Sequence, residues 1–152
     1  VGPGGHLYVV GELDRALHVL AWDQDAATAR PVAVLPLPGG DSFPAHPVID
    51  RGELLVSVRG PDVLARFAVH QDGARLEPLP ARSADVSWPR HMAVVGHHVV
   101  CAGQGPDEVV ALPADPAQAP LRLAVPVPAC VVPVASDTGH GAPGRASSTR
   151  RG

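Results

Sequence analysis

Apolar residues in this chain come in short runs, and each run is bounded by Gly, Pro or Asp. Runs of four to eight Val- and Leu-rich residues between such breakers predict β-strands rather than helices. The abundance of the breakers, 18 Pro and 16 Gly, also argues against long helices. The predicted strands are Leu7–Val10, Ala16–Asp23, Ala29–Leu37, Ala45–Ile49, Glu53–Val58, Val63–His70, Arg75–Leu79, Pro89–Val95, His98–Ala102, Glu108–Pro113 and Leu121–Val127.

The strand pattern repeats. Leu54–Asp62 reads LLVSVRGPD and Val99–Asp107 reads VVCAGQGPD, at a spacing of 45 residues. An earlier copy, LYVVGELD at Leu7–Asp14, lies 47 residues before the middle one when Glu12 is aligned with Arg59. A period in this range, built of short apolar strands, is typical of β-propeller blades. We therefore predict an all-β fold of about three four-stranded antiparallel blades, at residues 5–44, 45–88 and 89–134.

Stacked blades need neighbours, because a four-stranded sheet has two apolar faces and covers neither by itself. Three blades do not close a ring, so we expect the chain to be a C-terminal fragment of a longer protein. The expected partial propeller spans residues 1–135. Residues 136–152 are small, polar and basic, and we expect them to form a disordered tail.

The amino-acid composition argues against several classes of function. All 12 basic residues are Arg, which excludes a Schiff-base lysine and a P-loop lysine. The net charge of −3 argues against a nucleic-acid partner, and no apolar run of 18 residues argues for a membrane span. No signal peptide is visible, and we expect a cytoplasmic location. The oligomeric state stays open. Cys101 lies in an apolar run and is expected to be buried.

The repeat also predicts where polar side chains converge. Glu12 and Arg59 occupy one repeat position at the end of an inner strand, so both are expected to face the central channel. His46 opens the segment that carries Arg59. Together these residues supply a carboxylate, an imidazole and a cation, which can serve as a general base and as a binding group for an anion. The structural alternative is that Glu12 caps a turn and Arg59 pairs with Asp62.

Two further side chains are candidates for substrate binding. Arg90 belongs to a Pro89-Arg90-His91 element and precedes Gln104 by 14 residues. Arg90 either reaches the channel or ties blades together, and Gln104 is a candidate hydrogen-bond donor in the channel. Adjacent His97 and His98 face opposite sides of a strand, which is poor metal geometry. We expect no metal site and no cofactor.

Four segments in order resemble the lactonase family of β-propellers, which includes bacterial 6-phosphogluconolactonase and fungal carboxymuconate-lactonising enzymes. LYVVGELD is similar to the family's YVVNELDST, and His46 with LLVSVRGPD is similar to IHVSPDGRFLYVSNRGxD. WPRHMAVV followed by VVCAGQ is similar to PRHFxxxPxGRFLLVANQ, and VPVPACVVPV at Val125–Val134 is similar to a closing PxPxCV strand.

The resemblance implies a seven-bladed fold and a hydrolase acting on a small anionic sugar lactone such as 6-phosphogluconolactone. It implies that Glu12, His46 and Arg59 are catalytic, with Glu12 or His46 as the base and Arg59 binding the anionic group. The chain departs from the family where Gly11, Val58 and Gly103 replace Asn. A non-catalytic binding propeller, consistent with the lost Asn residues, is one alternative, and an inactive truncated product is another. Because three blades do not close a ring, we expect the chain alone to be inactive.

Overall fold

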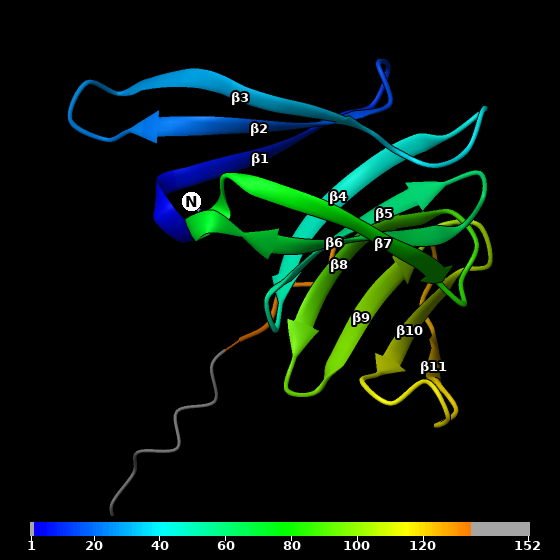
Figure 1. Cartoon of the computed structure of the whole chain (residues 1–152). Coiled ribbons are helices and arrows are strands. Elements are labelled where there is room, and N and C mark those ends of the chain that lie inside the picture. Colours follow the sequence, from blue (N-terminus) through cyan, green and yellow to red (C-terminus); the bar gives the residue numbers. More distant parts are fainter. Residues whose placement is uncertain (1, 135–152) are drawn as a thin grey trace, which may run out of the picture.

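The computed structural model describes residues 2–134, which fold into three antiparallel sheets that follow one another along the chain (Figure 1). The all-β prediction is confirmed. The first sheet contains β1 (His6–Gly11), β2 (Ala16–Asp23) and β3 (Thr28–Pro36). The second contains β4 (Phe43–Asp50), β5 (Glu53–Arg59), β6 (Val63–His70) and β7 (Arg75–Ser83). The third contains β8 (Pro89–Val95), β9 (His98–Gly103), β10 (Glu108–Pro113) and β11 (Leu121–Ala124).

Helical structure in this part of the chain is limited to two short 3₁₀ turns, η1 (Pro3–Gly5) and η2 (Gln71–Gly73). No helix within residues 2–134 is long and apolar enough to cross a membrane. The tail predicted at residues 136–152 lies outside the described residues.

The first sheet has three strands, as predicted for the first copy of the repeat, whereas the second and third sheets have four. Its edge strand β1 holds the repeat position of β5 and β9. The inner position that β4 and β8 hold in their sheets is not filled by any residue of the described range.

The segment Val125–Val134, which resembles a closing strand, is not a strand in the structure. The last strand, β11, ends at Ala124. Pro126, Pro128 and Pro133 explain the difference, since proline has no backbone N–H to donate to a neighbouring strand.

Equivalent turns connect the second and third strands of the repeat in each sheet. Arg15, Asp62 and Asp107 all have positive φ, at 57°, 55° and 55°. Their carbonyls accept hydrogen bonds from the backbone N–H groups of Leu37, Ala84 and Val125, at 3.0, 3.0 and 2.9 Å. Because these turns coincide, the residues that precede them, Glu12, Arg59 and Gln104, lie at equivalent places in the three sheets.

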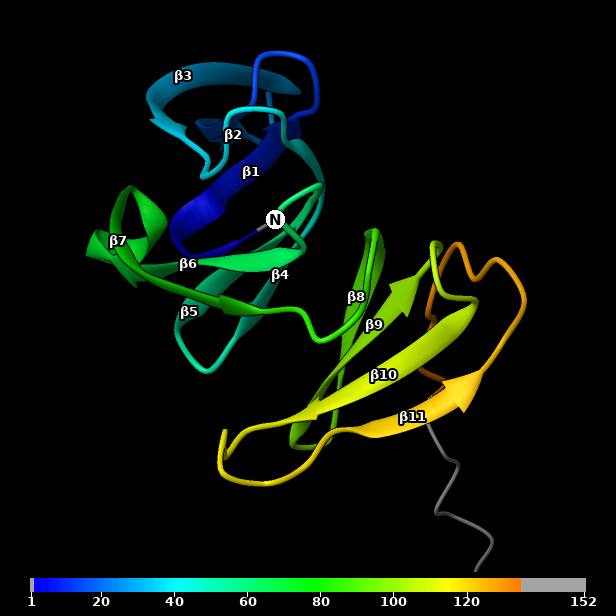
Figure 2. The same cartoon turned by 90° about the vertical axis from the view of Figure 1, so that its right-hand side faces the viewer.

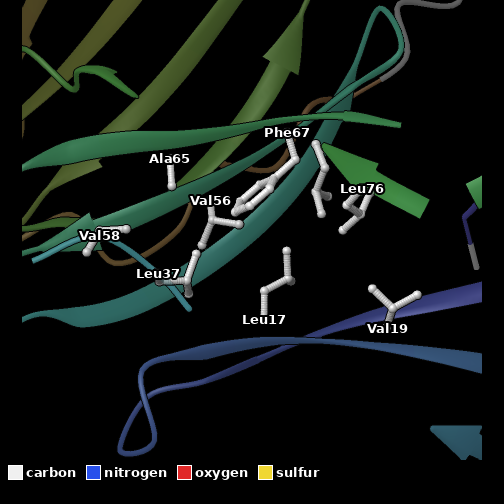
Figure 3. Close-up of a cluster of buried hydrophobic side chains, with 9 residues drawn as sticks. Leu17, Val19, Leu37, Val56, Val58, Ala65, Phe67 and Leu76 are labelled. Carbon is white, nitrogen blue, oxygen red and sulfur yellow. The ribbon is translucent and has the colours of Figure 1, made fainter. Parts of the chain in front are cut away.

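Side chains along the strands of the second sheet point alternately to its two faces, and this divides the core into two clusters. Val56 and Phe67 face the first sheet and pack with Leu17 and Val19 of β2 (Figure 3). Leu55 and Leu64 face the third sheet and pack with a second cluster. That second cluster comprises Leu55, Leu64, Ala84, Val86, Met92, Val99, Cys101, Val110 and Leu112. Figure 2 shows the three sheets as successive layers, with β4 near both β1 and β8.

Candidate active site

A cavity of about 240 Å³ lies where the inner ends of the sheets meet. Its polar lining comes from Glu12, after β1, from Arg59, at the end of β5, and from Arg90, near the start of β8. Val10, Pro44 and Ala45 supply the apolar wall. The structure therefore brings together three of the five side chains that the sequence singled out.

Glu12 and Arg59 form a direct ion pair. The Nη2 group of Arg59 donates to Oε1 of Glu12 at 2.7 Å. The Arg59 side chain is only 12% exposed, whereas that of Glu12 is 53% exposed. The guanidinium is thus held in the wall of the cavity while the carboxylate reaches the opening.

Two further contacts fix the Arg59 guanidinium. Its Nε donates to the carbonyl oxygen of Phe43 at 3.0 Å. Its central carbon lies 5.6 Å from the centroid of the Trp88 ring, in a cation–π arrangement. Trp88 in turn packs against Phe43, with ring centroids 5.8 Å apart. An arginine held on three sides presents its charge with little loss of side-chain entropy on binding.

The alternative pairing of Arg59 with Asp62 is wrong. Oδ1 of Asp62 instead accepts the backbone N–H of Trp88 at 2.9 Å. Asp62 therefore braces the residue on which Arg59 stacks and does not neutralise the arginine itself.

Arg90 and Gln104 contact one another within the third sheet. Nη1 of Arg90 donates to Oε1 of Gln104 at 2.8 Å. Arg90 lines the cavity with Glu12 and Arg59, whereas Gln104 does not. Arg90 thus reaches the inner ends of the sheets, and Gln104 supports it from the equivalent position of its own sheet.

His46 lies beside the cavity but turns its ring toward the third sheet. It falls in the irregular part of β4 between Pro44 and Pro47. Its backbone N–H donates to Oγ of the buried Ser57 at 3.1 Å. Its ring stacks on that of His91, with centroids 3.8 Å apart and planes inclined by 30°.

Both imidazoles are neutral near pH 7. Burial, and to a smaller extent the nearby His91, lowers the pKa of His46 to about 4. Burial also lowers the pKa of His91. The backbone N–H of Val131 lies 3.3 Å from Nδ1 of His91, which places the His91 proton on Nε2. Nδ1 of His46 is buried without a hydrogen-bond partner in the described residues.

Sequence reasoning assigned no role to Trp88 or His91. His91 carried a usable signal, because its spacing of 45 residues from His46 equals that between Arg59 and Gln104. Trp88 carried little signal beyond being one of two tryptophans.

At two of the positions where the family has Asn, neighbouring atoms leave no room for a side chain. A side chain at Gly103 would overlap the methyl groups of the buried Val86. A side chain at Gly11 would overlap the Asp14 carboxylate, which accepts from Nε2 of His18 at 2.7 Å. The third replacement, Val58, is fully buried in the first core cluster. The departures from the family pattern are therefore accommodated by packing.

Other reactive groups do not gather at this site. Cys101 is fully buried, and burial raises the pKa of its thiol to about 12, so it stays protonated. Within residues 2–134, no group of three or more His, Cys, Asp or Glu side chains is arranged to hold a metal ion. The chemistry available at the cavity is that of one carboxylate and two guanidinium groups, with a neutral imidazole pair alongside.

Solved structures share this fold. The periplasmic gluconolactonase PpgL of Pseudomonas aeruginosa is 23% identical, with a TM-score of 0.73, over 85% of this chain and 40% of that one. A protein from Lactobacillus plantarum is 24% identical, with a TM-score of 0.71, over 84% of this chain and 41% of that one. The chain thus spans about 40% of the length of these structures.

No curated protein matches the chain. The family model described as "Lactonase, 7-bladed beta-propeller" matches residues 3–134, which is nearly all of the described range. The resemblance found in the sequence is confirmed, and the chain belongs to the lactonase family of seven-bladed β-propellers.

Proposed function

We propose that the protein hydrolyses a lactone and that the cavity between Glu12, Arg59 and Arg90 is part of its active site. The observation that carries the proposal is the meeting of these three charged side chains around one cavity at the inner strand ends. Membership of the lactonase family supports the reaction type.

The two arginines suit an anionic substrate. Arg59 is held in place by Phe43 and Trp88, and Arg90 opens onto the same cavity. Guanidinium groups match phosphate and carboxylate oxygens in pairs. A sugar lactone that carries an anionic group, such as 6-phosphogluconolactone, fits this charge pattern.

Hydrolysis requires a water molecule to attack the lactone carbonyl carbon and to lose a proton to a base. The ring C–O bond then breaks, and the leaving alkoxide takes up a proton. Glu12 is the better-placed base, because its carboxylate lines the cavity. His46 is neutral and its Nδ1 has no hydrogen-bond partner in the described residues, but its ring is stacked on His91 and does not line the cavity. Arg59, paired with Glu12, holds that carboxylate in position.

We also propose that the chain is one section of a larger ring whose other blades complete the substrate pocket. Its span of about 40% of the solved relatives supports this.

The test is lactone hydrolysis above the spontaneous rate, measured on the parent protein that carries these residues. We expect Glu12→Gln to lower kcat by about 10²–10⁴-fold, because it removes the base. Arg59→Ala is expected mainly to raise KM for an anionic lactone. Glu77→Gln, which changes an exposed carboxylate of β7, is the matched control and leaves both constants unchanged. Full activity of Glu12→Gln would contradict the assignment.

A non-catalytic binding propeller is the second candidate. The direct Glu12–Arg59 ion pair favours it, as does the closure of the Gly11 and Gly103 positions. This candidate predicts that 6-phosphogluconate binds and that Arg59→Ala weakens binding, with no lactone turnover in the parent protein.

A further inference from the structure

A second charged cavity lies at the opposite end of the middle sheet. β4 runs from Phe43 to Asp50 and β5 returns from Glu53 to Arg59. The candidate active site lies at the Phe43 and Arg59 end, and the second cavity, of about 310 Å³, lies at the Asp50 and Glu53 end. Both the second sheet and the loop before β11 form its walls. Its charged lining consists of Asp50, Arg51, Glu53, Arg66 and Arg82.

The two carboxylates of this cavity already have arginine partners. Arg51 donates to Oδ2 of Asp50 from Nε at 3.1 Å and from Nη2 at 2.6 Å. Arg66 holds both oxygens of Glu53, from Nε at 2.9 Å and from Nη2 at 2.8 Å. In these two pairs, each carboxylate of the lining is matched by one arginine.

Arg82 is the third arginine and the one without such a partner. Its Nε is buried and makes no hydrogen bond to any described residue. Neither carboxylate of the cavity forms an ion pair with it. With three arginines against two carboxylates, the lining carries one uncompensated positive charge.

A buried N–H group without an acceptor on a half-buried cation is costly, and arginine does not escape the cost by losing its proton. Burial lowers the pKa of Arg82, whereas the hydrogen bond to Glu53 raises the pKa of Arg66. Arg66 is hydrogen-bonded to a carboxylate, whereas Asp50 and Glu53 act on Arg82 only through space and leave its Nε without an acceptor. A negatively charged ligand in the cavity would supply the missing hydrogen-bond acceptor and the missing charge.

We propose that this cavity is a binding site for a small oxyanion of the phosphate class, with Arg82 as its principal ligand. Arginine donors in a fixed fork suit tetrahedral phosphate oxygens, and the cavity is large enough for a phosphate-bearing small molecule. The site is independent of the lactonase proposal, because it shares no residue with the cavity around Glu12.

The test is calorimetric titration with inorganic phosphate at constant ionic strength, in an Arg59→Gln background that weakens anion binding at the candidate active site. We expect saturable binding in this background. Adding Arg82→Gln is expected to weaken binding by about tenfold or more, the effect of losing a charged hydrogen bond. Adding Arg75→Gln is the matched control, because Arg75 lies exposed on the same strand, and it leaves the affinity unchanged.

Circular dichroism checks that each variant is folded. If the glutamine variant does not fold, Arg82→Lys replaces it, since lysine keeps the charge but loses the fork; weaker binding by this variant is then the expected result. The proposal is overturned if the Arg59→Gln protein does not bind phosphate. It is also overturned if substitution of Arg82 leaves the affinity unchanged.

Discussion

The first and second sheets meet through a cluster around Leu17, Val56 and Phe67, and the second and third meet through a cluster around Leu64, Met92 and Val110. Each cluster contains nine buried side chains, so the two interfaces have buried cores of similar size. The polar groups beside the two interfaces differ. A charged pair, Glu12–Arg59, bridges the first and second sheets, whereas a neutral stack, His46–His91, bridges the second and third.

The difference shows which positions of a repeat are constrained. Residues between the sheets must fill a fixed volume, and their substitution costs packing energy. Residues at the inner strand ends, such as Glu12, Arg59 and Gln104, lie beyond the core and are free to differ in charge. Polar side chains that act at only one of the two interfaces are therefore found at these strand ends.

The largest expected effect is the loss of stability when a buried leucine is removed from either core cluster. Leu17→Ala and Leu64→Ala each remove a fully buried side chain, one from each cluster. Each is expected to lower the free energy of unfolding by about 2–5 kcal/mol, measured by urea denaturation. Losses of similar size would confirm that both interfaces are structural. A negligible loss at one of them would show that that interface does not hold the sheets together.

The next prediction separates the two interfaces. Oδ1 of Asp62 accepts the N–H of Trp88, and Oδ1 of the equivalent Asp107 accepts the N–H of Val127, at 2.9 and 2.8 Å. Replacing either by Ala is expected to cost about 1–2 kcal/mol of stability. Only Asp62→Ala is expected to raise KM or weaken ligand binding, because only Asp62 braces the Trp88 that lies under Arg59.

Asp62→Asn keeps the acceptor oxygen and is expected to restore ligand binding. If Asp62→Ala and Asp107→Ala affect ligand binding equally, Trp88 does not position Arg59.

The smallest effect is a pH dependence at the histidine stack. The pKa of His46 is about 4 in the folded protein and 6.5 in an ordinary environment. Between these values the unfolded chain binds more protons, so stability falls as the pH is lowered from about 6.5 toward 4. His46→Phe removes this term and is expected to lose less stability than the wild type between pH 7 and 5. The exposed His97→Gln serves as the control. Equal losses in wild type and His46→Phe would contradict the buried, neutral state of His46.

Much of the fold follows from local sequence. The predicted strands Ala16–Asp23, Val63–His70, Pro89–Val95 and Glu108–Pro113 have the same bounds in the structure. Strand positions depend on neighbouring residues and on the Gly, Pro and Asp that end each run, so the sequence displays them directly.

Partners between sheets are harder to predict. Asp62 is close to Arg59 in sequence, yet Arg59 pairs with Glu12, 47 residues away. That choice depends on how one sheet is rotated against the next, which the hydrophobic pattern does not encode. For the same reason, the sequence did not predict the contact between Trp88 and Arg59 or the stacking of His46 on His91. The resemblance to a closing strand at Val125–Val134 also gave a wrong prediction, because three prolines in this segment prevent regular strand pairing despite the apolar pattern.

The most direct test of the account is a crystal structure of the protein with bound 6-phosphogluconate, the product expected from 6-phosphogluconolactone. We predict that an anionic group of the ligand lies within hydrogen-bond distance of Arg59 and Arg90, with the ligand's carboxyl carbon beside Glu12. A ligand bound elsewhere, with the cavity between these three side chains left empty, would contradict it.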